Sequence, residues 1–385
     1  MKIFLANFQG TGVGYFRHWL PAAALKARGH EVIYFPESGD ALTHINKITK
    51  GHQAEWFEKH LPSIDIIHTG YSTNESHIRL LATAREYAAF KLGRNIPLIT
   101  DIDDDIINVP SYNAAFGYYH GASTQRKIAK FHLQISDAVT TSTAPLMEVL
   151  RPMAKRIYHL PNCFNSSDWE QFPTDPSRDL DKSVRLIFNG GPSRVADYDT
   201  LQGVIESLME RYNGDGAPLL RLFFLGCAPK WITPWLQDKT NPLANRAFYI
   251  HSSDIEDYWA TLRWLRPNIL VNPLVCNTFN ASKSSIKAWD AILAHAAYVG
   301  TDWATHDDIP ATVMHKCVSP LQWNETLSYL IENADARAKS AERLSAWGLE
   351  NMAIEHHINR WESVYEECVK IPVIRRLEET ITVGG

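Results

Sequence analysis

The chain has 385 residues, of which 45% are hydrophobic and 21% charged. That length exceeds what one hydrophobic core covers, and the composition is globular rather than disordered, so we expect two domains of about 190 residues each. The 38 Lys and Arg residues against 43 Asp and Glu residues give a formal net charge of −5. This charge argues against non-specific coating of nucleic acid, which needs a surplus of cations, but it permits a small basic cleft.

Apolar runs and cysteines constrain the location. The longest apolar runs are far too short to span a bilayer, so we expect no integral membrane association. The segment 1–6 is typical of a first strand rather than of a signal peptide. The five cysteines include no C-x-x-C pair and predict neither a disulfide framework nor a zinc site; they are Cys163, Cys227, Cys276, Cys317 and Cys368. A cytoplasmic location is expected, the host cytoplasm if a phage encodes the chain.

Short strand-like runs alternate with amphipathic helical stretches through the first half. Strands are predicted at 2–6, 31–35, 64–68, 97–101 and 138–141, and helices at 15–28, 72–91 and 122–135. The first helix stops at Gly29, a common residue at helix C-termini. This βαβα order predicts a parallel sheet covered by helices on both faces.

The periodicity fails between 161 and 183, a stretch rich in Asn, Ser, Asp and Pro that indicates a linker. Alternation then restarts, with strands at 184–188, 219–225, 248–250, 268–271 and 298–300 and helices at 197–212, 254–265, 284–295, 340–351 and 357–369. We therefore predict two doubly wound, Rossmann-like α/β domains at 1–170 and 171–355, with a closing helix and tail at 356–385 that pack back toward the first domain. Ligands of such sheets bind beyond the carboxyl ends of the strands, in the cleft between domains.

A glycine loop, QGTGVGYFR at 9–17, joins the first strand to the first helix. Glycines let a ligand approach the backbone, and a helix N-terminus presents free N–H groups to an anion. We expect ligand contacts at Gly12, Val13, Gly14 and Arg17. A tight turn without a ligand is the alternative. An NAD-dependent oxidoreductase also stays open because Glu37 could bind a ribose, although a dinucleotide fingerprint needs glycine where Tyr15 stands.

An acidic run, TDIDDD at 100–105, directly follows a predicted strand. Clustered carboxylates raise one another's pKa unless a cation or donor relieves them. Three interpretations follow: a D-x-D metal site, an active-site role without metal, or a helix cap with solvated charges. The D-x-D element belongs to a single-domain architecture, so we predict no metal and an active-site role for Asp103 and Asp104.

Two motifs of the second half combine small residues with a cation. FNGGPSR at 188–194 repeats the strand, glycine turn and helix arrangement, and its cation could neutralise a phosphate. In PLVCNTFNASKSSIKAWD at 273–290, Lys283 and the new helix N-terminus would converge on a diphosphate, and Asp290 could bind ribose hydroxyls. An ordinary loop with an amphipathic helix is the alternative. The expected binding residues here are Asn189, Gly190, Gly191, Ser193, Arg194, His251, Asn280, Ser282, Lys283, Ser284, Ser285 and Asp290.

Together these patterns resemble the GT-B glycosyltransferases, in particular the retaining group that uses nucleotide-diphosphate sugars. The resemblance rests on GTGVGYFR, on LPA at 20–22, on GHEV at 29–32, on the glycine turn, on the block ending at Asp290 and on Trp361. In the Glu-x7-Glu signature of that group, the second glutamate matches Asp290 and the first matches Ser282, so the signature is degraded. Asp103 and Asp104 stand where the group often has a histidine.

The resemblance implies an enzyme that transfers a hexose or pentose, without a prosthetic group. The first domain would bind the acceptor and the second a nucleotide sugar, with a UDP-sugar favoured. Asp290 would hold the donor ribose and Ser282 would lie near the donor sugar. Arg194 matches the diphosphate-binding arginine, whereas Asp199 replaces its lysine partner and Lys283 supplies the cation. Retention of configuration without a metal is implied, with cations stabilising the departing phosphate.

The acceptor is expected at the polar and aromatic loop 110–120, through Tyr112, Asn113, Tyr118, Tyr119 and His120. These side chains could equally cover an edge of the core. The acceptor is a saccharide, a lipid-linked sugar or a protein, or a hydroxymethylated DNA base as in phage enzymes, for which Arg126, Lys127 and Lys130 could form a local groove. A GT-B binding protein without catalysis is the other alternative, motivated by the departures at Ser282 and Asp290.

Overall fold

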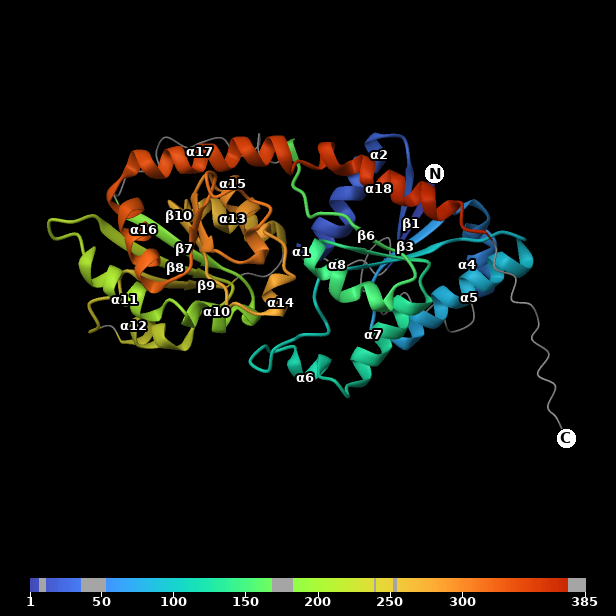
Figure 1. The fold of residues 1–385 in the computed structure, drawn as a ribbon, viewed down its shortest axis with the longest axis horizontal. Helices are drawn as coiled ribbons and strands as arrows, with labels where there is room; N and C mark the ends of the chain where they lie inside the picture. Colours follow the sequence, from blue (N-terminus) through green and yellow to red (C-terminus); the bar gives the residue numbers. More distant parts are fainter. Residues whose placement is uncertain (7–11, 36–52, 168–182, 239, 252–254, 373–385) are drawn as a thin grey trace.

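The computed structural model describes residues 1–6, 12–35, 53–167, 183–238, 240–251 and 255–372. Within these ranges the chain forms two α/β halves, each built on a six-stranded parallel sheet (Figure 1). Glu37 and the loop residues before Gly12 lie outside the described residues, as do most of the predicted linker and the end of the tail.

The N-terminal sheet has the strand order β2-β1-β3-β4-β5-β6. Its strands are β1 (Lys2–Ala6), β2 (Glu31–Phe35), β3 (Ile66–Gly70), β4 (Leu98–Ile102), β5 (Ala138–Thr141) and β6 (Ile157–His159). Its helical segments are α1 (Gly12–Gly14), the π-helix η1 (Tyr15–Trp19), α2 (Leu20–Ala27), α4 (Gln53–His60), η3 (Leu61–Ser63), α5 (Glu75–Lys91), α6 (Phe116–Tyr119), α7 (Thr124–Ile135), α8 (Ala144–Leu150) and η4 (Arg151–Met153).

The C-terminal sheet has the order β12-β11-β10-β7-β8-β9. Its strands are β7 (Ser183–Asn189), β8 (Leu219–Leu225), β9 (Ala247–Ile250), β10 (Ile269–Asn272), β11 (Ala297–Thr301) and β12 (His315–Cys317). The helical segments up to the last sheet strand are η6 (Pro192–Arg194), α10 (Val195–Asp199), α11 (Gln202–Arg211), η7 (Lys230–Ile232), α12 (Thr233–Gln237), α13 (Ile255–Leu265), α14 (Thr278–Ala281), α15 (Ile286–Leu293) and η8 (Ala304–His306); α16 (Pro320–Glu332), α17 (Ala334–Asn351) and α18 (Ile354–Val369) follow.

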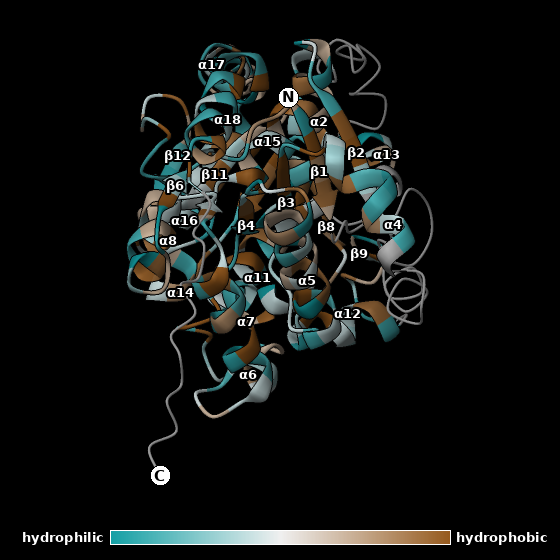
Figure 2. Cartoon of the chain, turned by 90° about the vertical axis from the view of Figure 1, so that its right-hand side faces the viewer, coloured by the Kyte–Doolittle hydropathy of each residue, from teal (hydrophilic) through white to brown (hydrophobic). Residues whose placement is uncertain are grey.

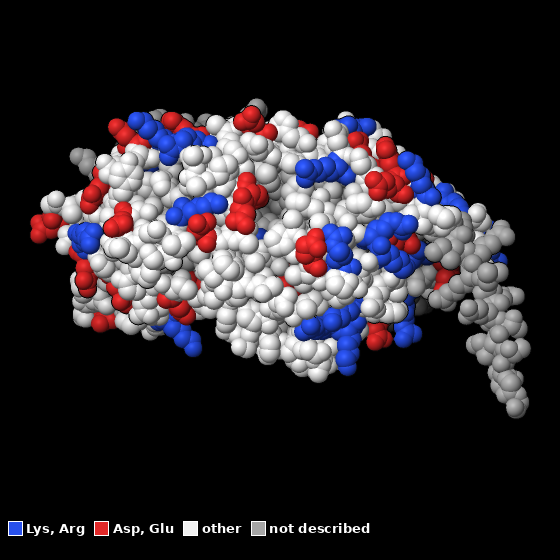
Figure 3. Space-filling view, viewed as in Figure 1, with Lys and Arg blue, Asp and Glu red and all other residues white. Residues whose placement is uncertain are grey.

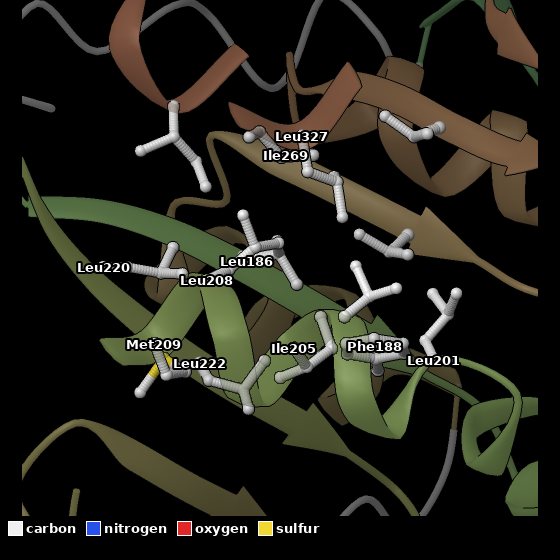
Figure 4. Close-up of a cluster of buried hydrophobic side chains, with 14 of the residues drawn as sticks. Leu186, Phe188, Leu201, Ile205, Leu208, Met209, Leu220, Leu222, Ile269 and Leu327 are labelled. Carbon is white, nitrogen blue, oxygen red and sulfur yellow. The ribbon is translucent and has the colours of Figure 1, made fainter. Parts of the chain in front are cut away.

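Buried aliphatic and aromatic side chains fill both faces of each sheet. In the C-terminal half, Leu186, Leu222 and Ile269 project from neighbouring strands onto Ile205 of α11 and Leu327 of α16 (Figure 4). Seen from the N-terminal half, hydrophobic strands run between helices that mix hydrophilic and hydrophobic residues (Figure 2). Burial of these side chains, at roughly 25 cal/mol per Å² of apolar surface, is the main source of stability in such a core.

Several helices begin at a side-chain cap that the sequence supplies. Asn74 accepts a hydrogen bond from the Ser76 N–H, Ser123 from that of Arg126, Thr143 from that of Leu146 and Ser319 from that of Gln322. Such caps satisfy N–H groups that have no partner inside the helix. They fix where α5, α7, α8 and α16 start, and hence where the preceding loops lie.

The last two helices run along both halves (Figure 1). Leu344 of α17 joins the core of the C-terminal half, whereas Trp361 and Tyr365 of α18 are buried against the N-terminal sheet. Phe164 lies beside Ala353 in a parallel bridge, so the segments before and between these helices meet where the chain crosses between the halves. The closing helix therefore contacts the N-terminal half.

The sequence pattern placed ten of the strands to within two residues. It missed β6 and β12, which are three residues long and only partly buried, so neither carries an apolar run. It merged α10 and α11 into one helix. None of the described helices is both long enough and apolar enough to cross a membrane.

Candidate active site

The carboxyl ends of the two sheets face each other, and loops from both ends are in contact. Thr143, after β5, donates from Oγ1 to the Ser282 carbonyl at 2.8 Å. Asn162, after β6, donates from Nδ2 to Ser284 Oγ at 2.7 Å. The acidic loop after β4 and the glycine turn after β7 open on the same junction, the position that binds ligands in parallel α/β sheets.

Lys283 is a cation of this junction, and the described residues give it no anionic partner at contact distance. Its side chain is half-buried, and its Nζ lies 4.7 Å from the centroid of the Phe279 ring. Burial and the nearby Arg194 guanidinium lower its pKa to about 8, while Asp197 and Asp104 act in the opposite direction. Within the described ranges, its ammonium makes no hydrogen bond and no ion pair. A partly desolvated ammonium of this kind favours an anionic ligand.

Arg194 approaches the same junction but is held by protein groups. Nη1 pairs with Asp197 at 3.0 Å, and Nη2 donates to Asn272 Oδ1 and, at 3.1 Å, to the Pro273 carbonyl. The glycine turn makes this possible, because a Cβ at Gly190 would lie 2.6 Å from Arg194 Cγ. Arg194 therefore contributes a fixed positive charge that acts on Lys283, rather than a side chain free to bind a ligand.

Asp290 lies on α15 and is buried, with its carboxylate surrounded by donors. Oδ2 accepts from Tyr258 Oη at 2.6 Å, Lys287 Nζ at 2.9 Å and Asn189 Nδ2 at 2.9 Å, and Oδ1 accepts from Trp259 Nε1 at 3.4 Å. Burial and the Asp290 charge raise the pKa of Tyr258 well above its usual range, so this phenol stays protonated and donates. The carboxylate predicted to hold ribose hydroxyls is thus already engaged by four protein donors.

Two residues of the site, Lys287 and Tyr258, are not among those predicted from the sequence. Lys287 stands three residues before Asp290 on one helix, the spacing at which charged side chains meet. That spacing was the available signal for Lys287. Tyr258 comes from α13, more than thirty positions away in the chain, and no local pattern points to it.

The acidic run divides into three environments. Asp101 is buried and pairs with Arg17 at 2.7 Å; burial alone would raise its pKa, but the guanidinium lowers it below the usual value. Asp105 accepts from the backbone N–H groups of Ile107 and Asn108, which makes it a turn-forming residue. Asp103 and Asp104 form no such ion pair within the described ranges, and Asp104 interacts electrostatically with Lys283 of the other half. Burial and the neighbouring Asp104 raise the pKa of Asp103 well above its usual range.

The expectation that Arg17 contacts the donor is wrong. Its side chain is fully buried and makes four hydrogen bonds, two to Asp101, one to the Leu160 carbonyl and one to Asn162 Oδ1. The Trp361 ring lies 5.3 Å from its guanidinium carbon. A guanidinium engaged in this way links β4 to the strand-end segment 160–162 and has no surface to offer a phosphate.

The other predicted donor-binding residues fall into two groups. Asn280, Ser282 and Ser285 are buried, and their side chains bond to Asp197, the Thr278 carbonyl and Asp308 respectively. They hold the loop in shape. The residues with backbone or side chain at the surface of the halves are Gly12, Val13, Gly190, Gly191, Ser193, Ser284 and His251, whereas Gly14 is buried.

The predicted acceptor loop carries exposed aromatic side chains. Tyr112 is 47% exposed and its hydroxyl accepts from Asn277 Nδ2 of the opposite half at 2.6 Å. Tyr118, 45% exposed, bonds to Thr73, and the half-buried Tyr119 bonds to Tyr71. Asn113 is buried and shapes the turn, and His120 is exposed. The tyrosine hydroxyls thus anchor the loop, while the rings of Tyr112 and Tyr118 stay exposed to solvent.

No protein-family model matches this sequence, and no curated protein is similar enough to match it. Solved structures do match over almost the whole chain. Sucrose-phosphate synthase from Thermosynechococcus elongatus is 13% identical with a TM-score of 0.64, covering 95% of this chain and 98% of that one. The Anabaena protein HepE in complex with UDP is 12% identical, with a TM-score of 0.62 and coverages of 95% and 100%.

A third match is an α-glucosyltransferase in complex with UDP-glucose and DNA containing an abasic site, 10% identical with a TM-score of 0.60. It covers 95% of this chain and 98% of its own. The chain has the GT-B fold. The fold prediction is therefore confirmed, and one of these structural neighbours is a glucosyltransferase.

Proposed function

We propose that this GT-B protein is a glycosyltransferase that moves a sugar from a nucleotide-diphosphate sugar, with a UDP-sugar favoured, to an acceptor hydroxyl. The observation that carries the proposal is Lys283, a half-buried ammonium without an anionic contact among the described residues, placed between two facing sheet ends. Arg194 and Lys287 also act on it electrostatically, and both lower its pKa. Because both of these cations are already paired with carboxylates, Lys283 is the charge that we propose meets the diphosphate.

The chemistry follows from where charge develops. When the bond between sugar and diphosphate breaks, negative charge grows on the departing phosphate, and fixed cations aimed at it stabilise the transition state. Lys283, Arg194 and the N-terminus of α15 are of this type, so we propose transfer that persists in EDTA. Asp103 and Asp104 lie on the acceptor side, where they would orient sugar or acceptor hydroxyls; Asp104 also interacts electrostatically with Lys283 across the junction.

The acceptor is proposed to enter along the loop 110–120. Beside it, a groove of about 410 Å³ between α5 and α7 is lined by Arg79, Lys127 and Phe131, the last 54% exposed. Basic atoms gather over this part of the surface, although both charge signs are interspersed on this face (Figure 3). A saccharide or glycoconjugate would use the exposed rings, whereas a hydroxymethylated DNA base would also need the basic residues.

The decisive experiment is a donor screen. UDP-, GDP-, ADP-, CDP- and dTDP-sugars are incubated with the protein, and released nucleoside diphosphate is measured. Hydrolysis or transfer from one donor supports the proposal, and Lys283→Ala or Arg194→Ala should each lose about 2–4 kcal/mol of transition-state stabilisation. Lys155→Ala removes an exposed lysine of the N-terminal half and is the matched control. Failure to bind any donor contradicts the proposal.

Two further measurements separate the finer assignments. The anomeric configuration of the product, read by NMR, decides whether the enzyme retains configuration as we propose. A gel shift with duplex DNA at low and high salt decides the acceptor class, because phosphate-based binding weakens steeply with salt. A donor that binds but never turns over with any acceptor favours a catalytically silent binding protein instead, in line with the engaged Asp290.

A further inference from the structure

The loop that carries Lys283 is held from the opposite half of the molecule. Thr143 Oγ1 donates to the carbonyl of Ser282, and Asn162 Nδ2 donates to Oγ of Ser284, so the bonds flank Lys283 on both sides. Inside the C-terminal half, the N–H groups of Ser282 and Lys283 bond to Thr278 and Asn280 within the turn. The side chains of Asn280 and Ser285 tie the two ends of the loop to Asp197 and Asp308 of the same half. For residues 282–284 themselves, the hydrogen bonds that reach beyond the loop within the described chain come from the N-terminal half, so the backbone beside Lys283 is held by both halves together.

Both anchoring side chains are fixed by other bonds. Thr143 is the N-cap of α8, and its Oγ1 accepts from the Leu146 N–H at 3.2 Å while donating to Ser282. A hydroxyl can donate one hydrogen bond and accept others, so the two roles are compatible. Thr143 is thus a rigid point at the end of β5.

Asn162 is fixed still more firmly. Its Oδ1 accepts from Arg17 Nη1 at 3.0 Å, and Arg17 is clamped to Asp101 on β4. Asn162 itself is buried. A continuous chain of charge-assisted and neutral hydrogen bonds therefore runs from the centre of the N-terminal sheet through Arg17 and Asn162 to Ser284, next to Lys283.

We infer that Thr143 and Asn162 are positioning residues that set Lys283 for the donor diphosphate. The inference rests on the proposed function, because it assigns a role to Lys283. A lysine side chain is long and flexible, so the placement of its backbone decides where its charge can act. Small misplacements of a group aimed at a reacting centre are costly. The donor site of one half is then complete only while the other half is docked on it.

The test uses binding of a nucleoside diphosphate by calorimetry. Among UDP, GDP, ADP, CDP and dTDP, the one that wild-type protein binds tightest is used, together with its nucleoside as the diphosphate-free probe. Three substitutions should each weaken binding of the diphosphate by roughly three- to tenfold, which corresponds to one net hydrogen bond: Thr143→Val, Asn162→Ala and Ser284→Ala. The nucleoside should bind as to wild type.

Further variants test whether a loss of affinity comes from the lost hydrogen bond and not from the substitution itself. Thr143→Ser keeps the hydroxyl and should restore wild-type affinity, and Thr83→Val is the same substitution on an exposed turn of α5. The double variant of Asn162→Ala and Ser284→Ala should be no weaker than Asn162→Ala alone, because both remove one shared bond. Thermal unfolding confirms that each variant is folded; if Asn162→Ala is not, Ser284→Ala breaks the same bond from the other side.

Three results overturn the inference. Wild-type diphosphate affinity in Thr143→Val and Ser284→Ala shows that the bonds do not position Lys283. Equal losses for diphosphate and nucleoside show general damage to the halves. The proposed function fails together with the inference if Lys283→Met binds the diphosphate as wild type does, or if wild type binds no diphosphate. The first two results, in contrast, overturn the inference and leave the proposed function standing.

Discussion

Because Lys283 loses its charge near pH 8, we predict that the affinity for a nucleoside diphosphate falls as the pH rises. Burial and Arg194 lower its pKa from 10.5 to about 8, so the free protein loses this charge as the pH rises through 8. Only the charged form attracts a diphosphate, whose own phosphate titrates lower, at about pH 6. About nine-tenths of the lysine is charged at pH 7 and about one-tenth at pH 9, so affinity should fall about tenfold, or ~1.4 kcal/mol.

The assay is calorimetric titration with nucleoside diphosphate at pH 7, 8 and 9. Lys283→Arg is the matched control, because its guanidinium stays charged over the whole range and should remove the pH dependence. Lys283→Met should bind more weakly by roughly 1.5–3 kcal/mol at pH 7, the value of a hydrogen bond to a charged group, and should also be insensitive to pH. An unchanged wild-type affinity from pH 7 to 9, or the same slope in Lys283→Arg, would refute the reasoning.

Three further substitutions test the framework. Arg17→Met leaves its buried carboxylate partner uncompensated, so chemical denaturation should show a loss of about 3–5 kcal/mol; a loss below 1 kcal/mol would contradict the buried pair. Gly216 has φ +71 and open space around it, so Gly216→Ala should lower the free energy of unfolding by about 1–3 kcal/mol. Gly226 has φ +96, and a Cβ there would also lie 2.6 Å from a backbone oxygen, so Gly226→Ala should destabilise the protein more than Gly216→Ala does. Asp290→Asn removes the counter-charge of Lys287 and should lower the free energy of unfolding by about 1–3 kcal/mol in urea; an unchanged midpoint would show that the network is not structural.

Residue patterning alone determined the two-domain α/β architecture. Strands buried on both faces of a parallel sheet are mostly apolar, so runs such as those of β1, β7 and β8 are visible without tertiary information. Gly29 ends the first helix with φ +89, the conformation that favours glycine. The carboxyl ends of parallel strands share one edge of a sheet, so the sequence also located the loops that form the junction.

Tertiary structure decided which charged residues in those loops are available to a ligand. Arg17 and Lys283 look alike in sequence, since each stands near a helix start after a strand-end loop. Arg17 meets a carboxylate from β4 and the carbonyl of Leu160 and is sealed in the interior, whereas Lys283 meets an aromatic ring and no anion within the described chain. Whether a charged side chain is paired inside the protein depends on partners from distant segments of the chain, and no local sequence pattern encodes those partners.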